Sequence, residues 1–293
     1  MAKKINIGKK NISAYLFLII PLVVFVTFFV IPNFGSLYYS FFKWNGLSPV
    51  KDFVGITNYI RLFKSSVFLL ILKNTFFYSV ALIIGYNIFG LILALLIYKK
   101  SKINSFFRTV YFLPAIFSSV SVGLVWSFIY DPNIGALNTI LKYVGLENFT
   151  TPWLSNPKTA IFAIVLIHMW ATIGYSMVVY IAGLQDIPEE LYEAAEVDGV
   201  NMWKKFFYIT VPLLRNSIMI NIVLATINGF TSFDFVYIMT RGGANHSSEV
   251  LATLLYREGF NYGNVGYSSA IAVFLVIIVL LISVFQTQSI QEK

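Results

Sequence analysis

The sequence has no cysteine and little charge: 12% of its 293 residues are Asp, Glu, Lys or Arg. The absence of cysteine excludes disulfides and thiolate metal sites. Soluble domains carry about a quarter charged residues, whereas this chain is 58% hydrophobic. Because one core cannot bury that much apolar side chain, the composition predicts a polytopic membrane protein.

A phosphate-binding loop of the form G-x-x-x-x-G-K-[ST] is also absent, so the chain is not expected to bind or hydrolyse ATP itself. No catalytic cluster, metal-ligand set or cofactor motif stands out. The net charge of +8 does not indicate nucleic acid, because the basic residues lie between hydrophobic runs and set membrane topology instead.

Six apolar runs of membrane-spanning length recur along the chain. They lie near residues 14–34, 72–98, 109–129, 159–184, 213–239 and 265–285. We therefore expect an all-α integral membrane protein, a six-transmembrane-helix bundle with residues 1–293 as one domain. The first run follows four lysines and resembles a signal peptide, but its length and the lack of a small-x-small site predict an uncleaved first span.

The basic residues that flank the first two spans set the expected orientation. Lysines crowd before the first run and again at 99–108, and such clusters stay in the cytoplasm. An even number of spans then returns the C-terminus to the cytoplasm. This topology predicts a multi-pass protein with both termini cytoplasmic, and it places residues 185–212 on the cytoplasmic side.

Residues 185–212 hold the densest charge of the chain. Glu189, Glu193 and Glu196 are spaced i, i+4, i+7 and fall on one helical face. Asp198-Gly199 ends that helix, and Asn201 can cap a second short helix. The segment therefore predicts a helix–turn–helix finger with one acidic face, and its aromatic second limb suggests a peg that docks on a cytoplasmic protein.

This segment resembles the EAA motif of the permease subunits of bacterial ABC importers. The resemblance rests on Glu193-Ala194-Ala195, Asp198-Gly199, Ile209 and Pro212. Further stretches resemble carbohydrate-uptake permeases, in particular the first, maltose-transporter-type permease of such systems: 53–63, 108–120, 183–195, 232–244 and 255–273. In that family the motif forms the coupling helices that seat in a cleft of the ATPase.

The resemblance implies both a role for the finger and a set of partners. The implied ATPase-coupling residues are Glu190, Glu193, Ala194, Ala195, Asp198, Gly199, Trp203, Phe207 and Pro212. The implied partners are a second homologous permease, two cytoplasmic ATPase subunits that bind ATP-Mg, and an extracytoplasmic solute-binding protein. The implied location is the bacterial cell membrane, in contact with lipid and not with nucleic acid.

Polar side chains at membrane depth mark the expected substrate path, because such groups are costly there. His168, Thr172 and Tyr175 follow helical spacing on the fourth span, and an aromatic hydroxyl suits a sugar. The expected path residues are Ser118, Ser119, His168, Trp170, Thr172, Tyr175, Asn228 and Thr231. Ala225 and Gly229 stand where the family has polar lining residues, which leaves the identity of the sugar open.

The predicted function is the membrane-spanning subunit of an ATP-driven importer of an oligosaccharide or disaccharide. An importer permease for glycerol phosphate is the nearest alternative. An ion-coupled secondary transporter would show buried, paired ionisable residues across several spans, or broken helices with inverted repeats. These spans are instead nearly free of charge, with Asp234 as their one carboxylate. A membrane-embedded enzyme would need a catalytic cluster.

Overall fold

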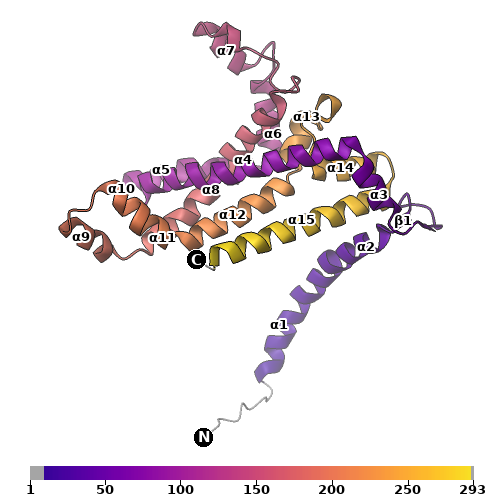
Figure 1. Ribbon diagram of the computed structural model, residues 1–293, viewed down its shortest axis with the longest axis horizontal. Coiled ribbons are helices and arrows are strands. Elements are labelled where there is room, and N and C mark those ends of the chain that lie inside the picture. The colour runs from indigo at the N-terminus through magenta and orange to yellow at the C-terminus, as the bar shows by residue number, and fades with distance from the viewer. Residues whose placement is uncertain (1–9, 292–293) are drawn as a thin grey trace. The chain divides into compact units, whose positions relative to one another are not determined.

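The apolar runs fold as long helices in a computed structural model that describes residues 10–291 (Figure 1). Over this part of the chain, five helical stretches are long and apolar enough to span a membrane, and a bent pair of helices makes a sixth candidate. The all-α membrane architecture expected from the sequence is therefore confirmed. The first stretch, residues 17–39, runs through α1 (Lys10–Phe25), a π-helical turn (Val26–Val30) and α2 (Ile31–Tyr39). The second is α4 (Ser66–Ile97) and the third is α8 (Ala160–Gln185). The fourth combines α12 (Arg215–Phe230) with α13 (Asp234–Thr240), and the fifth lies in α15 (Val265–Gln291).

Shorter elements connect these stretches. They are β1 (Phe42–Lys43), β2 (Asp52–Phe53), α3 (Thr57–Lys64), α5 (Lys102–Phe112), 3₁₀ turn Leu113–Ile116, α6 (Ser119–Ile129), α7 (Ala136–Tyr143), 3₁₀ turn Glu147–Phe149, α9 (Glu189–Val197), α10 (Met202–Lys205), π turn Phe206–Thr210, α11 (Val211–Leu213), 3₁₀ turn Ala244–His246, α14 (Leu251–Tyr256) and π turn Arg257–Asn261. The chain divides into two compact units, 1–62 with 257–273, and 63–256 with 274–293.

The first unit is organised around a short hairpin after α2. β1 and β2 pair antiparallel, with Phe42 opposite Phe53. The buried Asn58 side chain on α3 donates hydrogen bonds to the Ser40 and Phe42 carbonyls (2.8 and 3.0 Å). The Gly266 amide at the start of α15 donates to the Trp44 carbonyl (3.1 Å). These bonds satisfy backbone groups that would otherwise be buried without partners.

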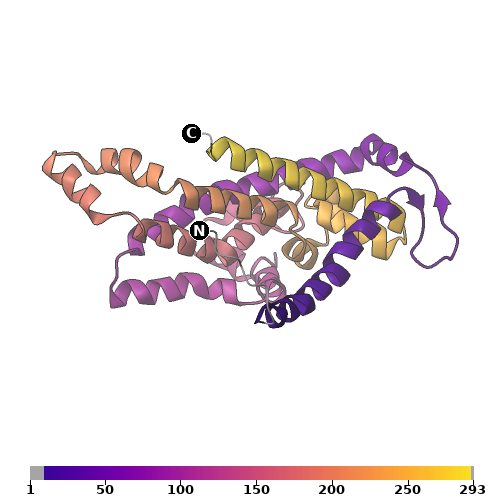
Figure 2. The same cartoon turned by 90° about the horizontal axis from the view of Figure 1, so that it is seen from below.

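The second unit is a bundle in which α4, α8 and α12 pack side by side (Figures 1 and 2). Its core includes Tyr78 and Leu82 of α4 and Ile164 of α8, all fully buried. Small residues permit the close helix contacts that membrane bundles favour. At Gly229 of α12, an added Cβ would lie 2.5 Å from the Cα of Ser79 on α4, so this crossing requires glycine.

Two of the candidate spans are broken rather than continuous. The third, expected near 109–129, ends its first helix at Ile116 and restarts at Ser119 with a bend of 92°. The fifth, expected near 213–239, is interrupted at residues 231–233 between α12 and α13. The expected mark of a secondary transporter is broken helices together with inverted repeats, so the two breaks alone do not distinguish that class from an importer permease.

Candidate functional site

The acidic finger forms the two short helices that the sequence predicts, and Figure 2 shows them projecting from the second unit. α9 begins directly after Pro188, which stands at the N-cap rather than inside the first turn. Glu190, Glu193 and Ala194 are exposed, whereas Ala195 is buried. Ala195 therefore packs inside the finger, and its part in ATPase coupling stays a prediction.

Gly199 makes the turn of the finger with a backbone φ of +70°, a conformation that costs glycine little. Next to the exposed Asp198, it separates α9 from α10, whose N-terminus is capped by the Asn201 side chain accepting from the Lys204 amide (2.9 Å). Local chemistry thus fixes the turn and both helix ends, as predicted.

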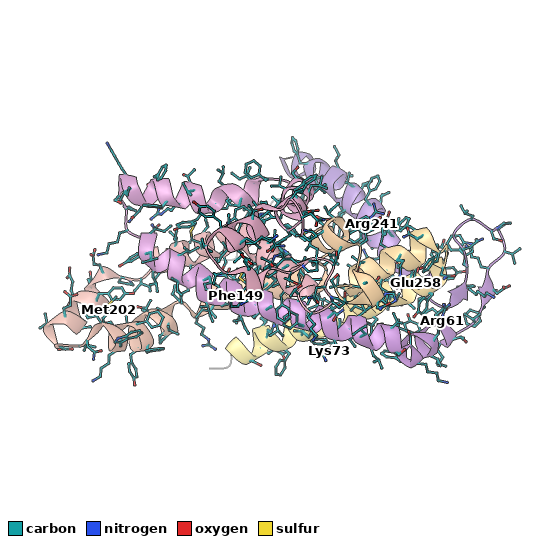
Figure 3. All side chains as sticks on the ribbon, turned by 90° about the horizontal axis from the view of Figure 1, so that it is seen from above. Arg61, Lys73, Phe149, Met202, Arg241 and Glu258 are labelled. Carbon is teal, nitrogen blue, oxygen red and sulfur yellow. The ribbon has the colours of Figure 1, made fainter. Side chains whose placement is uncertain are left out.

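The second limb carries an exposed aromatic surface. Trp203 is 73% exposed and stacks on the exposed Phe207, with ring centroids 6.4 Å apart. Met202, labelled on the finger in Figure 3, is also exposed. Pro212 lies in α11, before α12. An exposed apolar patch of this kind is typical of a docking surface.

Two side-chain bonds brace the limbs against each other. Lys205 Nζ donates to Glu196 Oε1 at 2.8 Å, and Tyr192 Oη bonds Thr210 Oγ1 at 2.9 Å. The hydrogen bond and positive charge of Lys205 hold the pKa of the Glu196 carboxyl below its ordinary value. The sequence analysis missed this brace, although opposite charges on either side of a predicted turn could have indicated it.

The breaks of the third and fifth candidate spans come together. Ser119, the first residue of α6, donates from Oγ to Oδ2 of Asp234, the first residue of α13, at 2.6 Å. Tyr175 of α8 is exposed and donates its hydroxyl to the Ala115 carbonyl at the same break (3.0 Å). Ser118 is exposed beside them. The structure thus brings three predicted path residues to the break of the third span, and one of them, Ser119, bonds the carboxylate of Asp234.

His168 and Thr172 bond side chains of α4. His168 is buried, with Nδ1 2.9 Å from the hydroxyl of Tyr78. Thr172 Oγ1 bonds the hydroxyl of Tyr86 and the carbonyl of His168. His168, Thr172 and Tyr175 thus share one face of the continuous helix α8, as their spacing predicts, but they meet different partners. Two of the three side chains join α8 to α4, and the third reaches the break.

Trp170 of α8 is half exposed and makes an edge-to-face contact with Trp126 of α6 (centroids 5.5 Å apart). Trp126 in turn packs against Tyr130 at 5.6 Å. The sequence analysis did not identify Trp126, because an aromatic residue in an apolar helix gives no sign of which neighbour it meets.

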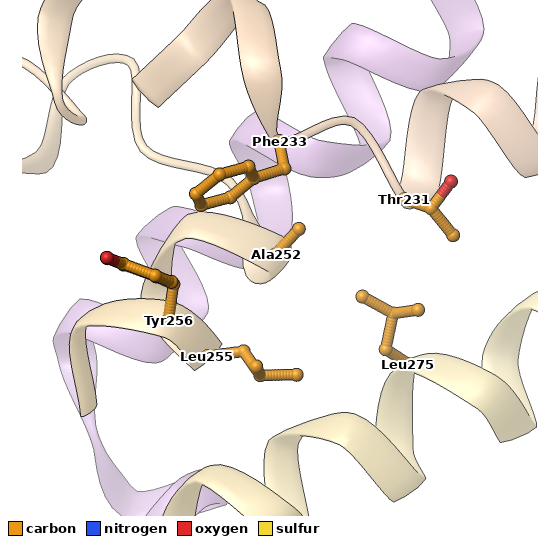
Figure 4. A pocket seen from close by; sticks show the side chains of 6 residues that line it. All are labelled: Thr231, Phe233, Ala252, Leu255, Tyr256 and Leu275. Atoms are coloured by element: carbon orange, nitrogen blue, oxygen red, sulfur yellow. The ribbon is translucent and has the colours of Figure 1, made fainter. Parts of the chain in front are cut away.

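Asn228 and Thr231 are exposed at the end of α12. Thr231 lines a pocket of about 280 Å³ at the break of the fifth span, shown in Figure 4. The other lining residues are Phe233, Ala252, Leu255, Tyr256 and Leu275. The pocket has apolar and aromatic walls, because the Thr231 hydroxyl points away from it and donates to the Ile227 carbonyl (2.7 Å). The aromatic members of the pocket were not predicted.

Comparison with known proteins shows the family to which the chain is similar. Residues 86–292 match the family described as binding-protein-dependent transport system inner membrane component. The chain is 40% identical over 282 residues, 96% of both chains, to the probable ABC transporter permease protein YurN of Bacillus subtilis. It is 34% identical to the multiple sugar-binding transport system permease protein MsmF of Streptococcus mutans, over 92% of each chain.

A solved structure has the same fold. It is the crystal structure of a bacterial ABC transporter involved in the import of the acidic polysaccharide alginate. It matches with a TM-score of 0.83 at 24% identity, covering 97% of this chain and 96% of that chain.

Proposed function

The chain belongs to the family of binding-protein-dependent transport system inner membrane components, and we propose that it forms half of the translocation path for an oligosaccharide or disaccharide. Its partners in the proposal are a second, homologous permease, two cytoplasmic ATPase subunits that bind ATP and Mg²⁺, and an extracytoplasmic solute-binding protein. Both termini lie in the cytoplasm, and ATP hydrolysis belongs to the partner chains.

The meeting of two broken spans at Ser119 and Asp234 is the observation that carries the proposal. Irregular backbone at membrane depth is tolerated where it lines a cavity or path rather than lipid, and transporters place substrate at such breaks. Tyr175 and Trp170 bring exposed aromatic faces to this region, and aromatic rings with hydroxyl groups nearby suit the apolar face and hydroxyls of a sugar.

The names of several relatives also favour a sugar. One is a multiple sugar-binding transport system permease, and another, 31% identical over 91% of this chain, is the trehalose/maltose transport system permease protein MalF of Thermococcus litoralis. The test is ATP-dependent uptake by the reconstituted complex, with labelled maltose, trehalose, cellobiose and glycerol 3-phosphate. We expect a neutral disaccharide to be transported. Uptake of glycerol 3-phosphate alone would refute the assignment.

The finger is the proposed contact with the ATPase. Its exposed Glu193 offers a carboxylate for a basic ATPase residue, and Trp203 and Phe207 offer apolar surface for the cleft. Movement of the cleft would then pass through the braced finger to α8 and α12, which the finger connects.

Co-purification tests this contact. We expect Glu193→Lys to lower the recovery of the ATPase with the permease by at least tenfold, because it places like charges at the interface. Glu147→Lys, in the connection between α6 and α8, is the matched control and should retain the ATPase. Full ATP-driven uptake by Glu193→Lys would overturn the assigned role.

A further inference from the structure

We propose that Asp234 selects the charge of the transported sugar, so that the path accepts neutral and amine-bearing saccharides and disfavours those bearing carboxylate or phosphate. This inference rests on the proposed carbohydrate path. It names a substrate class within it, and it assigns a role to a residue that the sequence analysis named only as the one carboxylate of the spans.

Asp234 is placed where it can act on a substrate. Its side chain is exposed at the point where the two broken spans meet, and one of its oxygens accepts from Ser119 at 2.6 Å. An ionised carboxylate has two oxygens and about four acceptor positions. The single bond to Ser119 therefore leaves acceptor capacity for sugar hydroxyl or ammonium groups.

The negative charge of Asp234 is not neutralised by a neighbouring side chain. Across residues 10–291, Asp234 forms no ion pair within 4.0 Å, and its charge acts on the His168 ring only from beyond that distance. The remaining path residues at the breaks, Ser118, Ser119, Tyr175 and Trp170, carry no charge. A solute that reaches this point therefore meets one unpaired negative charge.

Such a charge discriminates strongly between solutes of similar shape. A unit charge in a partly hydrated site changes the affinity for a charged group a few ångströms away by on the order of tenfold or more. An anionic sugar would lose affinity, whereas an amine-bearing one would gain it. This path would thus differ in charge preference from a path for an acidic polysaccharide, although the fold is shared with an alginate importer.

The test compares three forms of one sugar on the complete complex in nanodiscs. The probes are the neutral disaccharide with the highest uptake, its 6-amino-6-deoxy form and its 6-carboxyl form, with affinities measured by saturation-transfer NMR titration. For the wild type we expect the amine form to bind at least tenfold more tightly than the carboxyl form. Asp234→Asn, which keeps an oxygen acceptor for Ser119, should reduce that ratio about tenfold.

Two variants separate charge from fold. Ser119→Ala removes the hydrogen bond but keeps the carboxylate, and Asp131→Asn changes a carboxylate that accepts from the Asn133 and Ile134 amides in the connection after α6. Both should keep the wild-type ratio. An unchanged ratio in Asp234→Asn, or an equal change in Ser119→Ala, would overturn the inference. If no neutral disaccharide is taken up at all, the carbohydrate function itself fails, which the uptake assay reports separately.

Discussion

The bond between Tyr78 and His168 yields the sharpest quantitative prediction, because it decides whether His168 joins helices or contacts substrate. Both side chains are buried, and the bond between Tyr78 Oη and His168 Nδ1 measures 2.9 Å. The His168 ring also stacks on Phe235 with centroids 4.8 Å apart. Substitution of Tyr78 or His168 by phenylalanine keeps an aromatic ring at that position and removes the polar atom that forms the bond.

Each single substitution leaves one buried polar group unpaired, which costs about 1–3 kcal/mol. Bonds between membrane helices lie toward the low end, with coupling energies of about 0.6–1.7 kcal/mol. Tyr78→Phe and His168→Phe should therefore each destabilise the complex by about 1–2 kcal/mol. The double variant replaces both partners by apolar rings, so it should recover most of that loss.

The wild type, the two single variants and the double variant form a double-mutant cycle. Reversible unfolding in mixed micelles measures the stability of all four proteins, and uptake of the neutral disaccharide is measured in parallel. If His168 only joins α8 to α4, the double variant should regain stability and uptake together. Additive losses in the cycle would refute the bond's role in packing. A double variant that regains stability while its KM for the sugar rises tenfold would show that His168 contacts substrate.

Three further predictions concern the α12–α4 crossing and the finger. Gly229→Ala should lower the free energy of unfolding by about 1–3 kcal/mol, because the added methyl group is overpacked against Ser79. Ser79→Gly in the same chain should restore part of that stability. Unfolding measurements that find no such recovery would contradict the close contact between α12 and α4 at Gly229. The Glu196 carboxyl, followed by carboxyl NMR, should titrate below the ordinary pKa of glutamate, and Lys205→Gln should raise that pKa. The ion pair between Glu196 and Lys205 is fully formed at pH values above the ordinary carboxyl pKa, and it is lost as the pH falls through the lowered pKa of Glu196. Gly199→Ala should destabilise the finger by about 1 kcal/mol because φ is positive there, measured as faster amide exchange in α9, and unchanged exchange would exclude the strain.

The sequence by itself determined the family, the membrane class and the finger. Each depends on residues close together in the chain: spans of about 20 apolar residues are visible one at a time, and Gly199 and Asn201 fix a turn and a cap within a few residues. Polar caps and glycine turns act through local backbone geometry, so they can be predicted without knowledge of the tertiary structure.

Tertiary structure alone decided which polar residues meet at membrane depth. Ser119 and Asp234 are 115 positions apart, and no local pattern brings them together. His168 and Thr172 bond residues of α4 while Tyr175 bonds the Ala115 carbonyl, because packing sets the rotation of α8 about its axis and therefore the partner that each side chain meets. A helix that is apolar on all sides does not encode that rotation in its periodicity, so the interhelical contacts determine which side chains line the path.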